Sequence, residues 1–101
     1  MFKDLDPLLH SQLRLAIISM LVSNDEVDFN YIKDYTKATS GNISIQIKKL
    51  QDAGYIEVVK SFKNNYQNTS LKITSKGQKA FEEYVENLKQ YINKADQSFK
   101  Q

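Results

Sequence analysis

Several residue types that carry chemistry are scarce in this chain of 101 residues, which has no cysteine, one histidine, one arginine and one proline. Without cysteine there is no disulfide framework, no thiolate nucleophile and no thiol-based redox sensing. The single histidine, His10, gives little support for a Ser–His–Asp site or a metal site, and no glycine-rich phosphate loop is present. We therefore expect no enzyme, no metal and no cofactor.

Long apolar runs are also missing, and residues 1–7 lack a signal-peptide pattern. The composition, 41% hydrophobic and 26% charged, is that of a folded chain. A chain of this length forms one domain with a modest core. We expect a single soluble, cytoplasmic domain over residues 1–101.

Charge is unevenly distributed, although the net charge is only +2. Residues 1–47 carry −2, residues 48–79 carry +5, and residues 80–101 carry −1. A basic middle between mildly acidic ends is typical of proteins that bind nucleic acid. Lysines also solvate ordinary surfaces, so this distribution alone leaves the partner open.

The first half of the chain predicts three helices. A first helix should begin at Asp6-Pro7, an acidic cap followed by proline at the first helical position. Asp28 can cap a short second helix. A third helix is expected over residues 39–53, with Gly54 as the left-handed stop.

After Gly54 the spacing of apolar residues changes from that of a helix to that of a strand. Residues 55–63 are rich in β-branched and aromatic side chains, residues 63–68 are polar, and residues 69–73 alternate. These segments predict a hairpin with a polar tip. A capping box that begins at Ser75 then predicts a long helix over residues 75–98.

This order of elements predicts a winged helix-turn-helix, mainly α with a small β-hairpin wing (α+β), in which the third helix enters the DNA major groove. Ile43, Ile47 and Leu50 share one helical stripe, and at roughly 100° per residue Ile45 points away from it. The outward face offers an amide for adenine, a methyl contact for thymine, and cations for phosphate. The predicted contacts on this helix are Thr39, Ser40, Gly41, Asn42, Ser44, Ile45, Lys48 and Lys49.

The wing, residues 60–69, is expected to lie along the DNA backbone or an adjacent minor groove. Its predicted contacts are Lys60, Lys63, Asn64, Asn65, Tyr66, Gln67 and Asn68. The plainer interpretation is that a polar turn and a singly exposed isoleucine need no partner.

The last predicted helix carries a narrow apolar seam with spacings of 4, 3, 4, 3 and 4, which favours a coiled coil. The seam consists of Phe81, Val85, Leu88, Ile92, Ala95 and Phe99, and Tyr84 and Tyr91 widen it on one side. We expect this helix to form a homodimer, the alternative being that its apolar face packs on its own domain.

Three stretches, "HSQLRLAIISML", "DFNYIKDYTKATSGNISIQIKKLQDAGYIEV" and "TSLKITSKGQKAFEEYVENL", resemble the small stand-alone winged-helix transcriptional regulators of the MarR-like type. The resemblance covers residues 5–92 and is most specific at residues 10–15, 39–42, 50–55 and 74–77. It implies a dimer on a near-palindromic operator, with the interface formed by the first and last helices. The predicted interface residues therefore also include Leu9 and Leu13 of the first helix.

The chain departs from this family in its wing, which has neither arginine nor proline. Arginine suits the narrow minor groove of A·T-rich DNA particularly well, so that contact is in question. We expect a sequence-specific, double-stranded DNA-binding regulator that acts as a repressor. The alternatives are a winged-helix module that binds protein and a coiled-coil adaptor without DNA binding. RNA binding and an unidentified small-molecule effector stay open.

Overall fold

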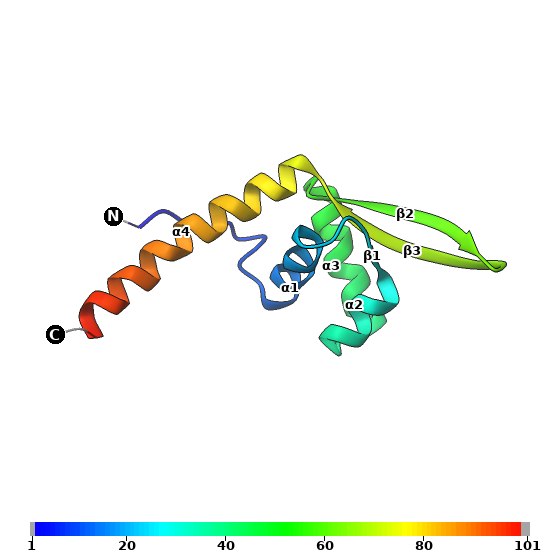
Figure 1. The fold of residues 1–101 in the computed structure, drawn as a ribbon, viewed down its shortest axis with the longest axis horizontal. Helices are drawn as coiled ribbons and strands as arrows, with labels where there is room; N and C mark the ends of the chain where they lie inside the picture. Colours follow the sequence, from blue (N-terminus) through cyan, green and yellow to red (C-terminus); the bar gives the residue numbers. More distant parts are fainter. Residues whose placement is uncertain (1, 100–101) are drawn as a thin grey trace.

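A computed structural model describes residues 2–99, apart from the side chains of Lys63, Ser98 and Phe99. The elements are helices α1 (Gln12–Val22), α2 (Phe29–Thr36), α3 (Ser40–Asp52) and α4 (Ser75–Phe99), and strands β1 (Val27–Asp28), β2 (Ile56–Lys63) and β3 (Tyr66–Ile73). Figure 1 shows α1–α3 packed together in the middle, the β2–β3 hairpin extending on one side and α4 on the other. The resulting shape measures 61 × 25 × 21 Å. This is the expected winged helix-turn-helix with a long C-terminal helix.

The core lies where α1, α2, α3 and the sheet meet. Its fully buried side chains are Leu9, Ile17, Ile18, Leu21, Ile32, Ile43, Leu50 and Leu71. Burying a leucine or isoleucine contributes about 1.5 to 3 kcal/mol, so this cluster supplies the main stabilisation of the domain. None of the helices in residues 2–99 is both long enough and apolar enough to span a membrane.

The sheet has the antiparallel order β1-β3-β2. Its turn contains only Asn64 and Asn65, both with positive φ (52° and 68°), which is the two-residue hairpin geometry that asparagine tolerates. The expectation of a polar loop over residues 63–68 was therefore wrong in extent, because Tyr66 already pairs with Lys63. Strand β1 was not predicted from the sequence, since two residues are too short for a periodic signal.

The expected start of the first helix at Asp6-Pro7 was also wrong. Asp6 caps a single turn, in which its Oδ1 accepts from the Leu8 N–H and its carbonyl accepts from the His10 N–H, both at 2.8 Å. Ser11 then adopts an extended backbone (φ −150°, ψ 128°), and α1 begins only at Gln12. This interruption turns Leu9 into the core.

The N-terminal segment is also tied to the end of α3. The Tyr55 hydroxyl donates to Asp6 Oδ2 at 2.6 Å. Burial of the phenol, and next the hydrogen bond to this carboxylate, raise the pKa of Tyr55 to about 12. The hydroxyl therefore stays protonated and keeps donating to Asp6 above about pH 10, where an ordinary tyrosine ionises.

Helix α4 begins at Ser75 as expected, but its cap is Thr74. Thr74 Oγ1 accepts from the Gly77 N–H at 3.0 Å and donates to the Gly54 carbonyl at 2.6 Å. A Cβ at Gly77 would lie 2.1 Å from the Tyr55 carbonyl oxygen. The start of α4 thus packs directly against the backbone that leaves α3.

Replacing each of the two helical glycines with alanine should change the free energy of unfolding in opposite directions. Gly77→Ala forces the α4 backbone away from Tyr55 and should lower the free energy of unfolding by about 1 to 3 kcal/mol. Gly41→Ala is the matched control, because its Cβ meets nothing within 4 Å. A helical alanine should raise stability there by about 0.5 kcal/mol. Urea unfolding followed by circular dichroism measures both, and equal effects would contradict the close packing at Gly77.

Candidate nucleic-acid interface

Helices α2 and α3 form the expected helix-turn-helix. Lys37 ends α2 in the left-handed region (φ 61°), and Thr39 then caps α3 by accepting from the Asn42 N–H at 3.1 Å. The first N–H groups of a helix have no partner within the helix and carry partial positive charge. The exposed start of α3 can therefore receive a phosphate oxygen.

The outward face of α3 is arranged as the sequence predicted. Ile43, Ile47 and Leu50 are buried, whereas Ile45 keeps 56% of its surface exposed. The predicted contacts that are exposed on this helix are Thr39, Ser40, Gly41, Asn42, Ser44, Ile45, Lys48 and Lys49. A cation, an amide and a branched apolar side chain thus share one accessible surface.

A groove of about 670 Å³ separates α3 from the wing. Ser44, Lys48 and Gln51 line it from α3, and Lys60 and Thr69 line it from the strands. Lys60 lies opposite Thr69 in the hairpin register, so both point to the α3 side. Two lysines from different elements therefore flank one groove.

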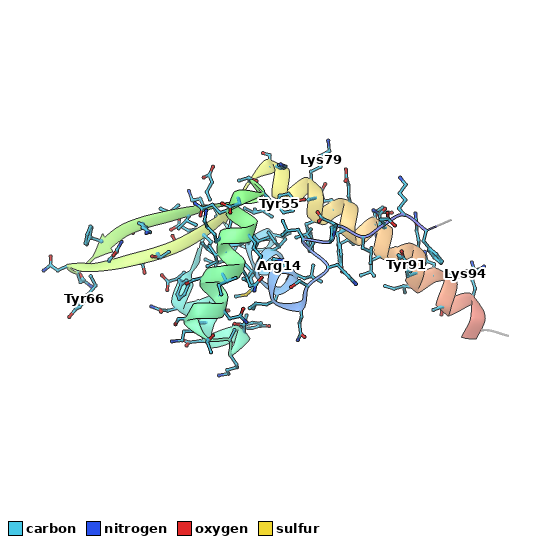
Figure 2. All side chains as sticks on the ribbon, turned by 180° about the vertical axis from the view of Figure 1, so that it is seen from behind. Arg14, Tyr55, Tyr66, Lys79, Tyr91 and Lys94 are labelled. Carbon is cyan, nitrogen blue, oxygen red and sulfur yellow. The ribbon has the colours of Figure 1, made fainter. Side chains whose placement is uncertain are left out.

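The tip of the wing projects far from the core, where Figure 2 labels Tyr66. Tyr66 is 78% exposed and Phe62 is 77% exposed. Phe62 pairs with Gln67 while Tyr66 pairs with Lys63, so the two aromatic rings point to opposite faces of the hairpin. Phe62 was not among the predicted contacts, although its spacing of two from Lys60 places both on one face.

The other predicted wing residues differ in how accessible they are. Asn64, Asn65 and Gln67 are exposed, and Asn68 is half-buried. The side chain of Lys63 lies outside the described part of the structure.

Asp52 places a negative charge on this otherwise basic surface. Its Oδ1 lies 2.7 Å from Lys48 Nζ, and both side chains are exposed. Such exposed pairs contribute only about 0 to 1 kcal/mol, so a phosphate can replace the carboxylate. This ion pair was not predicted, although the spacing of four residues on a helix indicates it.

The only arginine of the chain does not lie on the outward face. Arg14 Nε donates to the Leu8 carbonyl at 2.6 Å, and its Nη1 donates to Gln46 Oε1. Gln46 Nε2 in turn donates to Asn42 Oδ1 at 3.0 Å. Arg14 therefore links the N-terminal segment to the exposed amide of α3, and Gln46 was not among the predicted residues.

The residues predicted to form a dimer interface fall into two groups. Figure 2 shows Tyr91 beside the N-terminal segment, where its ring stacks on Phe2 with centroids 4.4 Å apart and its hydroxyl donates to the Lys3 carbonyl. Tyr84 is only 4% exposed and contacts His10 Nδ1 at 3.0 Å. Leu9 has no exposed surface. The chain itself thus covers Leu9 and Tyr84.

The second group keeps exposed surface. Ile92 is 58% exposed, and Leu13, Phe81, Val85 and Leu88 are half-buried. Tyr91 is also half-buried, but it belongs with the first group because it packs against Phe2 and Lys3. The side chain of Phe99 lies outside the described part of the structure.

A family model described as a winged helix DNA-binding domain matches residues 13–92. The chain belongs to this family. Solved structures similar to this chain are transcriptional regulators, which are not enzymes, and the expectation of a winged-helix transcriptional regulator is thereby confirmed.

Individual relatives agree with this family. A transcriptional regulator homologue from Pyrococcus horikoshii OT3 superposes with a TM-score of 0.82 at 25% identity, covering 88% of each chain. PadR of Bacillus subtilis, solved in complex with operator DNA, shares the fold with a TM-score of 0.67 at 21% identity, over 74% of this chain and 47% of that one. An uncharacterised protein of Methanocaldococcus jannaschii is 36% identical over 76 residues, which is 75% of this chain and 83% of that protein.

DNA is a polyanion, so removing the negative charge of Asp52 beside Lys48 should strengthen DNA binding. Asp52→Asn frees Lys48 and should raise affinity for a duplex about twofold to fivefold at low salt, with a smaller gain at high salt. Glu86→Gln is the matched control, because Glu86 forms a similar exposed pair with Lys89 on α4 (3.6 Å). Fluorescence anisotropy with a labelled duplex measures both. Equal gains for the two variants would show that only net charge matters.

Proposed function

We propose that this protein is a homodimeric, sequence-specific regulator of transcription that represses by occupying an operator in double-stranded DNA. In this proposal α3 enters the major groove, and the wing, residues 60–69, lies beside it on the backbone or in the minor groove. The observation that carries the proposal is the exposed face of α3, where Ile45 stands beside amide and ammonium groups. An apolar side chain in such a place suits the methyl group of thymine.

Base reading and phosphate binding are assigned to different residues. Asn42 has the amide that pairs with adenine through its N6 amino group and N7. Lys48 and Lys60, which flank the groove between α3 and the wing, are placed for phosphates. Phosphate contacts of this kind position a protein without selecting a sequence. Substitutions in the two sets of residues should therefore change DNA affinity in different ways.

The proposed dimer uses the exposed part of the α4 seam. Ile92 is accessible, Ala95 beside it is exposed, and Val85 and Leu88 continue the same stripe toward the head. The N-terminal segment covers a different side of α4, at Tyr91 and Gln90, so it leaves this stripe accessible. To read two half-sites of an operator, such a dimer has to place its two α3 helices about 34 Å apart, which is one turn of DNA.

Substitutions on α3 should separate the two kinds of contact. The double variant Lys48→Ala, Lys49→Ala should weaken binding to all duplexes and flatten the dependence of log affinity on log salt, by about 0.9 per lost phosphate contact. Asn42→Ala should weaken binding only to particular sequences. Fluorescence anisotropy at several salt concentrations is the measurement.

Lys89→Ala on α4 serves as the charge control, because it lies outside the proposed interface. If wild-type protein bound no duplex even at low salt, the winged-helix module that binds protein would replace this proposal. In that case the exposed Ile45 would belong to a protein interface.

The dimer has its own test. Ile92→Glu places a charge in the proposed seam and should convert the dimer to a monomer, while the fold stays intact because this side chain is exposed. Gln97→Glu is the matched control, since it adds the same charge to α4 about 140° away around the helix. Size-exclusion chromatography with light scattering distinguishes the two states. A wild-type monomer, or an Ile92→Glu dimer, would contradict the proposed seam.

A further inference from the structure

We propose that Arg14 acts through Gln46 as a positioning residue that decides which way the Asn42 amide faces, and hence that Asn42 reads adenine. This inference rests on the proposed function, because it assumes that α3 reads bases. The three side chains form one connected chain of hydrogen bonds from α1 to the exposed start of α3.

The direction of this chain follows from chemistry. A guanidinium has only donors, so the atom of Gln46 that faces Arg14 must be the carbonyl oxygen. The Gln46 amide nitrogen must then face Asn42, and it donates to Asn42 Oδ1 at 3.0 Å. Asn42 must therefore present its oxygen to Gln46. An asparagine without this neighbour could turn its amide either way, because its two ends have nearly the same shape.

Arg14 is well suited to fix this direction. Its Nε is held by the Leu8 carbonyl at 2.6 Å, so the fork of the guanidinium has one orientation. Leu8 lies in the capped turn that begins at Asp6, and Tyr55 ties that turn to the end of α3. Arg14, Gln46 and Leu8 are each only partly exposed, so their hydrogen bonds compete less with water than those on the open face.

The direction matters for the base that is read. The oxygen of Asn42 has two lone pairs, and Gln46 uses one of them. The second lone pair and the adjacent N–H then form an acceptor and a donor in a fixed order. Adenine presents the complementary donor and acceptor, N6 and N7, along the major groove. Turning the amide exchanges the acceptor and the donor, and the pairing with adenine is lost.

Two substitutions of Gln46 test this order, whereas Arg14→Ala is less informative because it also removes the contact to Leu8. Gln46→Glu keeps an acceptor for Arg14 but has no donor, so Asn42 must turn and donate its own N–H. Gln46→Leu removes both hydrogen bonds and leaves the amide free to turn. Gln51→Glu is the matched control, because it adds the same charge to the exposed surface of α3.

The experiment is selection from a library of random 20-base-pair duplexes by each full-length protein, followed by sequencing. Thermal unfolding by circular dichroism confirms that every variant is folded. Wild-type protein should enrich adenine at a position where Asn42→Ala does not. At that position the preference for adenine should fall about twofold to threefold in Gln46→Leu, through loss of the fixed orientation.

In Gln46→Glu the same preference should fall about tenfold or more, because adenine binding must break a hydrogen bond to a charged group. Gln51→Glu should keep the wild-type preference for adenine, and its added negative charge should weaken binding to all duplexes alike. This order of effects supports the proposed positioning role.

Two results would overturn the inference while leaving DNA binding intact: an unchanged adenine preference in Gln46→Glu, or no position at which Asn42→Ala alters the selected base. If wild-type protein retained no duplex at low salt, the proposed function itself would fail, and the inference would fail with it.

Discussion

The outward face of α3 can exist only because the opposite face is locked into the core. Ile43, Ile47 and Leu50 are buried together with side chains of α1 and the sheet. This packing sets the rotation of α3 about its axis, and the rotation decides which residues meet a partner. A rotation by about half a turn would bury Ile45 and expose Leu50. The same packing holds α3 beside the wing, so the groove between them has a defined shape.

Polar contacts refine the position that packing sets. The N-terminal segment connects α4 to the end of α3, because it contacts Tyr91 on α4 and Tyr55 just after α3. Arg14 connects this segment to α3 through Gln46. The chain has a single arginine, and it serves inside the fold rather than at the wing. The exposed face of α3 and the groove beside the wing consequently carry lysines, which interact with a phosphate as point charges rather than as bidentate donors.

The exposed surface of α3 carries charges of both signs. The segment over residues 48–79 carries +5, yet Asp52 stands directly beside Lys48 on the exposed face. An exposed pair of this kind is weak and is screened by salt. It lowers the attraction for any polyanion without preventing contact. In the proposed function, this weaker attraction favours discrimination between DNA sequences over tight binding to every duplex.

The sequence by itself determined the order of the main elements and the outward face of α3, since helical spacing, caps at Asp28 and Thr39, and the left-handed Gly54 are local signals. Tertiary structure alone decided the rest. Leu9 and Tyr84 carry the same apolar signal whether they face a second copy or their own core, and only the path of the N-terminal segment buries them here. The direction of the Asn42 amide likewise depends on Arg14, distant in sequence, because hydrogen bonds between side chains of different helices leave no periodic pattern.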